Sequence, residues 1–185
     1  MSEHNVISWN AMISTYAQHG QSRNALALLW MMLQQGFEPS RVTFVSLLDA
    51  CASNVMIDEA MLMHAYVASS NFDDDSIVGT SLVNIYGKCG SMSDAFHMFQ
   101  KIRVKNVVTW NAMIGGCSHH SNYELVLKEF RGMQKEGVKP NDATFVSLLS
   151  VCNHLGLVTE GCSHFGSIWA SNDDNMPYLD HYACV

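Results

Sequence analysis

The chain repeats its own sequence at regular distances, and this feature limits its fold more than any other. The peptide WNAMI occurs at residues 9–13 and 110–114, and TFVSLL occurs at 43–48 and 144–149, so both pairs lie 101 residues apart. Equivalent apolar positions divide that distance into steps of 35, 35 and 31 residues, followed by another step of 35: Met32, Val67, Ile102, Met133 and Ile168. A recurring period of this length indicates a repeat architecture.

Each repeat unit has the apolar pattern of two helices. In the first unit one apolar stripe with helical spacing runs from Trp9 to Tyr16, Gly20 interrupts it, and a second stripe runs from Ala25 to Met32. A single hairpin of this size cannot bury its apolar faces alone, whereas stacked hairpins bury them against one another. The sequence therefore predicts an all-α fold, a right-handed α-solenoid of stacked helical hairpins.

The period also sets the limits of the expected units. These are residues 6–40, 41–75, 76–106, 107–141 and 142–178, preceded by the tail of an upstream repeat at 1–5 and followed by the start of a truncated repeat at 179–185. We therefore expect a fragment, a shortened gene model or a degenerate copy of a longer array. No targeting peptide is recognisable at the start, so the chain as given is expected to be intracellular.

The units resemble the pentatricopeptide repeat family, specifically its plant class in which two longer units alternate with one short unit. The resemblance covers nearly the whole chain and is carried by VISWNAMISTYAQHG, FVSLLDACAS, LVNIYGKCGSMSDAFHMF, NVVTWNAMIGG, EGVKPNDATFVSLLS and HYAC. Units 6–40 and 107–141 resemble its standard type, units 41–75 and 142–178 its long variant, and unit 76–106 its short type. Members of this class bind single-stranded RNA in mitochondria or chloroplasts, and many direct C-to-U editing. The resemblance implies the same role for the full-length protein, with a separate deaminase or editing factor as partner.

The resemblance further implies that each unit recognises one base through its fifth and last residues, while the second residue packs against the base. The implied base-reading residues are Asn10 with Ser40, Thr80 with Asn106, and Asn111 with Asn141. Val45 with Asp75 is the corresponding weaker pair, because valine cannot hydrogen-bond to a base edge. The implied base-packing residues are Ile7, Val42, Ile77 and Val108. The family's code then implies the RNA site 5′-C-n-A-Y-n-3′, in which n is not recognised.

Simpler interpretations exist for several of these residues. An asparagine near the start of a helix most often caps the helix, and this applies to Asn10 and Asn111. Trp9 and Trp110 lie on apolar stripes, so we expect them to pack in the core and not to stack on bases. A capping box is expected where Ser91 begins the second helix of its unit, with an aspartate three residues later.

Charge and missing motifs limit the function further. The chain has 10 Lys and Arg against 17 Asp and Glu, a formal net charge of −7, which predicts weak binding to RNA phosphates. A helical scaffold for protein–protein interaction is therefore the alternative function, and a non-functional truncated fragment is a third. The zinc-deaminase signature, the P-loop and the GxSxG motif are absent, and C-x-H pairs such as Cys117 with His119 point to different helix faces. We expect a monomer without catalytic activity, cofactor, metal site or membrane span.

Overall fold

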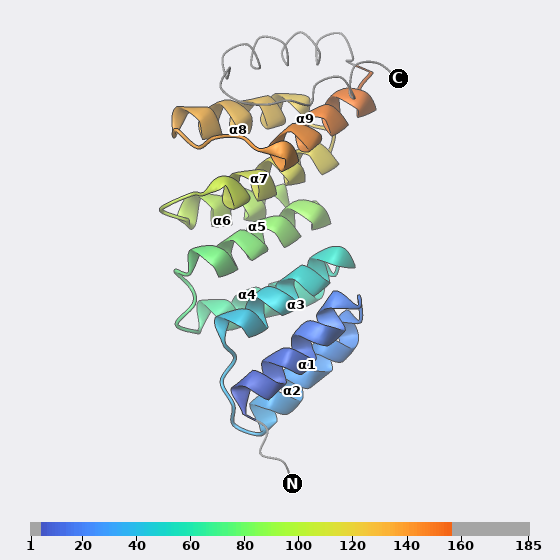
Figure 1. Ribbon diagram of the computed structural model, residues 1–185, viewed down its shortest axis with the longest axis vertical. Helices are drawn as coiled ribbons and strands as arrows, with labels where there is room; N and C mark the ends of the chain where they lie inside the picture. Colours follow the sequence, from blue (N-terminus) through green and yellow to red (C-terminus); the bar gives the residue numbers. More distant parts are fainter. Residues whose placement is uncertain (1–4, 157–185) are drawn as a thin grey trace.

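The computed structural model describes residues 5–156, and within them the chain forms nine α-helices and no strand. The helices are α1 (Val6–Gln18), α2 (Ser22–Gln34), α3 (Arg41–Ser53), α4 (Ile57–Ala68), α5 (Ser76–Cys89), α6 (Met92–Lys101), α7 (Val107–His119), α8 (Tyr123–Lys135) and α9 (Asp142–His154). They stack along the long axis of the molecule from α1 near the N-terminus to α9 (Figure 1). The predicted α-solenoid is confirmed. Residues 1–4, residues 157–178 of the expected fifth unit and the expected truncated repeat at 179–185 lie outside the described residues.

The helices form two layers with different roles. Each odd-numbered helix contacts the next odd-numbered helix, so α1, α3, α5, α7 and α9 form a continuous layer. Each even-numbered helix packs against the odd-numbered helices before and after it. Equivalent residues of the odd-numbered helices therefore lie in rows along the solenoid. Such rows are the structural basis for a surface that repeats from unit to unit.

The apolar stripes meet between the two layers and form the core. The predicted core packing of Trp9 and Trp110 is confirmed, because only 2% and 3% of their surface is exposed. Phe99 of α6 packs edge-on against Trp110, with 4.8 Å between the ring centroids. Burying a large apolar side chain stabilises a fold by roughly 1.5–3 kcal/mol. The glycine expected to end the first helix, Gly20, adopts a left-handed φ of 71°.

Helices α5 and α7 pack closely against each other at two glycines. A Cβ atom added to Gly87 would lie 2.9 Å from the Cα atom of Gly116, which is closer than side chains pack. Nε2 of His120 lies 2.8 Å from the carbonyl oxygen of Gly87 and joins the same two helices. This contact fixes α7 against α5 and so places the residues at the N-terminal ends of both helices side by side.

Candidate nucleic-acid interface

A polar side chain caps each odd-numbered helix at its N-terminus. The capping residues are Asn5, Ser40, Asp75, Asn106 and Asn141, which precede α1, α3, α5, α7 and α9. Each accepts a backbone N–H of the first turn, so its side chain has a fixed place at the start of the helix. Asn10 and Asn111 lie inside α1 and α7. The capping interpretation is therefore wrong for both of them.

Two of these caps are reciprocal capping boxes that the sequence analysis missed. In both, the capping side chain accepts the backbone N–H of a threonine, whose hydroxyl in turn accepts the backbone N–H of the cap: Ser40 with Thr43, and Asn141 with Thr144. The box predicted at Ser91 is wrong, because the Ser91 hydroxyl donates to the carboxylate of Asp94 and caps no backbone group. The usual signature has Glu or Gln at the third helical position, so a threonine there gave no signal.

The structure brings Asn10 and Ser40 together, although 30 residues separate them. Nδ2 of Asn10 donates a hydrogen bond of 2.8 Å to Oγ of Ser40. Oγ1 of Thr43, a fully buried residue, donates to Oδ1 of Asn10 over 2.5 Å. The two predicted base-reading residues of this unit thus form one polar cluster at the contact between α1 and α3.

The same arrangement recurs three units later, at the contact between α7 and α9. Nδ2 of Asn111 donates to Oδ1 of Asn141 over 2.8 Å. Oγ1 of Thr144, which is also fully buried, donates to Oδ1 of Asn111 over 2.6 Å. The recurrence of this geometry shows that it belongs to the repeat and not to one local sequence.

Thr80 and Asn106 are joined indirectly, at the contact between α5 and α7. Oγ1 of Thr80 lies 2.8 Å from Oγ1 of the buried Thr109. The Thr109 hydroxyl also lies 3.3 Å from Oδ1 of Asn106. Since the Thr80 hydroxyl donates to the carbonyl oxygen of Ser76 over 2.7 Å, it accepts the Thr109 proton. All three predicted polar pairs therefore include a threonine from the unit that follows.

The fourth pair, Val45 with Asp75, differs in kind. Val45 is half-buried and packs against the core. Oδ2 of Asp75 lies 2.6 Å from both Nε and Nη2 of Arg41, and only 11% of the Asp75 side chain is exposed. Burial acts to raise the pKa of Asp75, but hydrogen bonds from the N–H groups of Val78 and Ile77 and from the Arg41 guanidinium outweigh it and hold that pKa below its usual value. The Asp75 carboxylate is therefore ionised, caps the N-terminus of α5, and has its charge balanced by the Arg41 guanidinium.

The four predicted base-packing residues form an exposed apolar row. Ile7, Val42, Ile77 and Val108 each occupy the second position of an odd-numbered helix, and between 50% and 76% of their surface is exposed. They lie three residues before the fifth position of each unit. Isolated exposed apolar side chains are common, but a row repeated at equivalent positions beside polar groups fits a ligand with flat apolar faces.

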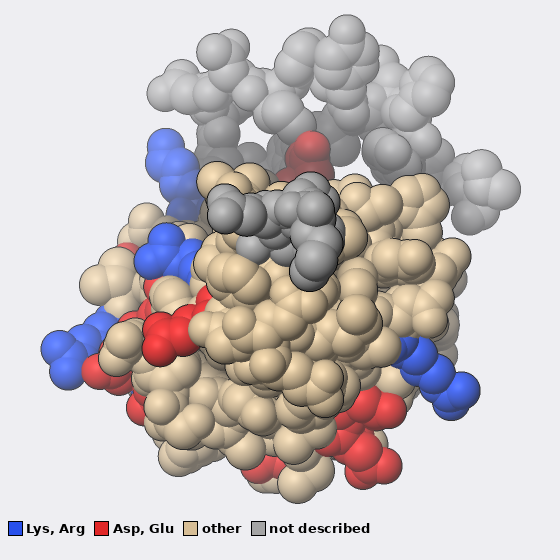
Figure 2. Space-filling view, turned by 90° about the horizontal axis from the view of Figure 1, so that it is seen from below, with Lys and Arg blue, Asp and Glu red and all other residues tan. Residues whose placement is uncertain are grey.

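The space-filling view shows how charge is distributed at the N-terminal end of the solenoid. Uncharged side chains cover the middle of this face, and the Lys, Arg, Asp and Glu side chains lie toward its edges (Figure 2). Within residues 5–156, no three His, Cys, Asp or Glu side chains lie close enough together to hold a metal ion. None of the helices in that range is long and apolar enough to cross a bilayer.

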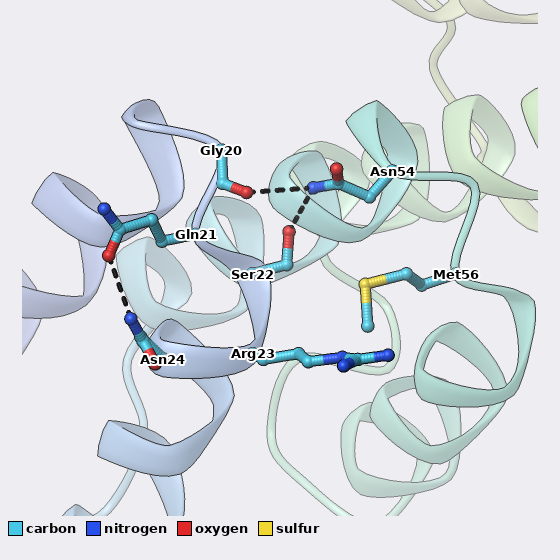
Figure 3. A pocket seen from close by; sticks show the side chains of 7 residues that line it. All are labelled: Gly20, Gln21, Ser22, Arg23, Asn24, Asn54 and Met56. Carbon is cyan, nitrogen blue, oxygen red and sulfur yellow. Dashed lines mark hydrogen bonds between the residues drawn. The ribbon is translucent and has the colours of Figure 1, made fainter.

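A pocket of about 410 Å³ lies at the opposite ends of the first helices, near the turn between α1 and α2. Asn54 fills much of its polar wall, because its Nδ2 donates to the carbonyl oxygen of Gly20 over 3.3 Å and to Oγ of Ser22 (Figure 3). A helix of 13 residues is roughly 20 Å long, so the pocket is remote from the polar pairs. Asn54 binds Ser22 and Asn24 donates to Gln21, which indicates a structural role for these side chains.

Comparison with known proteins agrees with this geometry. A mitochondrial pentatricopeptide repeat-containing protein of Arabidopsis thaliana is 38% identical over 187 aligned residues, which cover 100% of this chain and 27% of that protein. A chloroplastic protein of the same kind and organism, CRR2, is 35% identical over 183 residues, which cover 98% of this chain and 28% of that protein. The chain thus spans less than a third of the length of either relative.

A solved structure extends the comparison to the fold. The pentatricopeptide repeat protein PPR10 from maize, in complex with an 18-nucleotide psaJ RNA element, superimposes with a TM-score of 0.77 at 19% identity, over 91% of this chain and 26% of PPR10. The model of the PPR repeat family matches residues 4–53 and 105–154, and the PPR repeat model matches residues 42–66 and 80–107. The family matches together cover more than half of the sequence, and the chain therefore belongs to the PPR repeat family.

Proposed function

We propose that this chain binds single-stranded RNA in a sequence-specific manner and has no catalytic activity of its own. The observation that carries the proposal is the repeated pairing of the fifth and last residues of three units beside an exposed apolar row. Amide and hydroxyl groups offer donors and acceptors to base edges, and β-branched side chains offer contact to base faces. PPR10, which has the same fold, was crystallised with RNA.

In the Thr80–Asn106 pair, the hydrogen-bonding groups that the protein itself does not use support the selection of one base. Oδ1 of Asn106 accepts from the backbone N–H groups of Val108 and Thr109, at 2.9 and 3.0 Å, which occupy both of its lone pairs. Only the two N–H groups of its carboxamide remain for a ligand. Adenine presents the acceptor N1 at the centre of its pairing edge, where guanine presents an N–H donor. Thr80 with Asn106 is therefore expected to select A, as the site C-n-A-Y-n requires.

The arrangement of the units supports the proposed plant class with alternating long and short repeats. The odd-numbered helices begin at residues 6, 41, 76, 107 and 142, which are 35, 35, 31 and 35 residues apart. In the long-variant unit 41–75, Val45 offers no hydrogen bond and Asp75 is engaged by Arg41. We propose that this unit spaces its neighbours along the RNA and contributes little to base selection.

The cellular role follows from the relatives. Proteins similar to this chain along its whole length are named mitochondrial and chloroplastic, and they are much longer than it is. We propose that the full-length protein acts in one of these organelles in RNA processing, such as the selection of a site for C-to-U editing, and that a separate deaminase supplies the chemistry. The solenoid is proposed to act as a monomer.

A second candidate, a scaffold for a protein partner, is favoured by one apolar patch. Trp30 and Met31 of α2 and Met61 and Leu62 of α4 are exposed large apolar residues. The rings of Trp30 and Tyr66 lie 5.7 Å apart, so side chains of the two helices meet beside these residues. The net charge of −7 agrees with this alternative, because it weakens attraction to phosphate.

Fluorescence anisotropy with labelled RNA tests the two candidates. The purified chain is titrated at low salt into an unstructured RNA containing C-n-A-Y-n and into one with A replaced by G, with Thr80→Ala and the control Val45→Ala beside it. We expect a preference for A that Thr80→Ala removes and Val45→Ala retains, with an affinity of roughly micromolar or weaker at physiological salt. Equal or undetectable binding to both RNAs by the folded chain would contradict base recognition and favour the scaffold.

A further inference from the structure

The third residue of each odd-numbered helix separates the units that have a polar pair from the one that does not. This position holds a threonine in α3, α7 and α9: Thr43, Thr109 and Thr144. At most 1% of the surface of each is exposed. Each is joined to the polar pair of the preceding unit. In α5 the same position is Val78, which is also fully buried, and the preceding unit has Val45 in place of a polar fifth residue.

The direction of the hydrogen bonds around Thr144 is determined by the backbone. The backbone N–H of Asn141 can only donate, and it donates to Oγ1 of Thr144 over 3.1 Å. The hydroxyl proton of Thr144 is then directed to Oδ1 of Asn111 at 2.6 Å, which is nearer than Oδ1 of Asn141 at 3.2 Å. With its oxygen held by Thr144, the Asn111 carboxamide must turn its nitrogen toward Asn141.

The same sequence of donors occurs around Thr43. The backbone N–H of Ser40 donates to Oγ1 of Thr43 over 2.9 Å, Thr43 donates to Oδ1 of Asn10, and Nδ2 of Asn10 donates to Oγ of Ser40. An unrestrained carboxamide can rotate by half a turn and exchange its donor face for its acceptor face. In both clusters the threonine hydroxyl removes that freedom.

We propose that Thr43, Thr109 and Thr144 are positioning residues that set the orientation of the base-reading side chains and thereby the base that each pair prefers; this rests on the proposed function in RNA binding. The threonines are buried and make no contact with a nucleotide themselves. They act through Asn10, Asn111 and the Thr80–Asn106 pair. Each pair is completed by a residue of the following unit, so base selection by one unit depends on its neighbour.

Packing alone does not require a hydroxyl at this position. Val78 has nearly the volume of threonine and is buried in the equivalent place in α5. A buried hydroxyl is costly unless it is hydrogen-bonded, so a threonine there is favourable only where the pair supplies partners. The fold therefore tolerates valine at this position, and Thr→Val is a test that removes the hydroxyl without removing the helix.

The test compares Thr144→Val with Thr144→Ser and with the control Thr15→Val. Thr15 lies in α1, and its hydroxyl donates to the carbonyl oxygen of Ala11. Thr15 belongs to none of the polar pairs. RNA affinities are measured for C-n-A-Y-n and for the same RNA with Y replaced by A. The side-chain amide signals of Asn111 and Asn141 are followed by NMR, together with their hydrogen exchange, in the absence of RNA.

We expect Thr144→Val to reduce the preference for Y over A roughly tenfold and to leave the preference at the other nucleotides unchanged, because one orienting hydrogen bond is lost. Thr144→Ser is expected to restore the preference, and Thr15→Val to keep it. Without RNA, Thr144→Val should shift the Asn111 amide signals and accelerate their exchange.

The RNA measurement and the NMR measurement can each overturn the inference. If the parent discriminates between bases and Thr144→Val discriminates equally well, or loses affinity uniformly for all RNAs, Thr144 does not position Asn111 for base selection. If the parent does not discriminate at all, the proposed function fails. The amide signals then still decide the structural part, and unchanged Asn111 signals in Thr144→Val would refute it.

Discussion

Two contacts between odd-numbered helices, α7 with α9 and α3 with α5, have the same backbone arrangement and different chemistry. At the first, Asn111, Asn141 and Thr144 form a closed hydrogen-bonded cluster. At the second, Val45 and Val78 are apolar at the equivalent positions. The polar residue that remains there, Asp75, is bound to Arg41 of the same unit and so is not directed to a ligand.

This difference separates the forces that hold the fold from those that recognise a ligand. Both contacts bury the third residue of the second helix, Thr144 in one and Val78 in the other, so the solenoid packs with or without the polar cluster. Apolar burial between the two layers supplies the main stabilisation in either case. The polar pairs can therefore differ from unit to unit without a change of fold, which is what a modular recognition surface requires.

The largest effect is expected when the α7–α9 contact is made to resemble the α3–α5 contact by Asn111→Val. The preference for Y is expected to disappear and RNA affinity to fall roughly tenfold, because the fifth residue no longer hydrogen-bonds to a base. The free energy of unfolding should fall by about 1 kcal/mol, since the buried Thr144 hydroxyl loses its acceptor. Anisotropy titrations and urea unfolding measure the two quantities.

The matched control for that change is Val45→Ala, which removes apolar atoms at the equivalent place of the other contact. It should leave every base preference as it is, although it costs about 1–2 kcal/mol of stability because Val45 is partly buried against the core. A loss of base preference in Val45→Ala, or a retained preference for Y in Asn111→Val, would show that the fifth residue is not what distinguishes the two contacts.

A smaller effect is expected from the reverse change, Val45→Asn combined with Val78→Thr. It supplies the α3–α5 contact with the carboxamide and the hydroxyl found at the α7–α9 contact. We expect a preference among bases to appear at the second nucleotide of C-n-A-Y-n, of only a few-fold, because Asp75 stays engaged with Arg41. Titration against the four RNAs that differ at this nucleotide measures it, and Val78→Thr alone should give none.

The sequence predicted the fold well because the information lies in a repeated pattern. Periodic apolar residues occur in unit after unit, so the helix order and the burial of Trp9 and Trp110 followed from spacing alone. The base-reading pairs depended on the resemblance to a family, since no spacing rule joins Asn10 to Ser40. That the two side chains touch became apparent only from the stacking of α1 on α3.

The parts that the sequence did not predict depend on tertiary geometry. Thr43, Thr109 and Thr144 gave no signal, because a threonine on a helical stripe looks like an ordinary part of the core. The ion pair between Arg41 and Asp75 was also not predicted, since the two residues are 34 positions apart. Arg41 begins α3, whereas Asp75 caps α5. The capping box at Ser91 was predicted from spacing and is wrong, because the Asp94 side chain takes the Ser91 hydroxyl instead.

The smallest expected effect concerns the ion pair that occupies the α3–α5 contact, tested by Arg41→Gln. The folded-state pKa of Asp75 lies below its usual value although burial acts against this, so the ionised carboxylate stabilises the fold above its unfolded pKa and that contribution is lost as pH falls through the folded pKa. Arg41→Gln should lower the free energy of unfolding by less than about 1 kcal/mol at pH 7, since the Arg41 side chain is 53% exposed. The difference from the parent should vanish in acid once Asp75 is protonated, as urea unfolding across a pH series would measure.

Lys101→Gln, which removes the exposed pair with Asp73 and leaves Asp75 intact, is the matched control for Arg41→Gln. Base preference should not change in Arg41→Gln, because Val45, the fifth residue of this unit, still offers no hydrogen bond to a base. A new preference at the second nucleotide would mean that Arg41 alone keeps this unit from selecting a base.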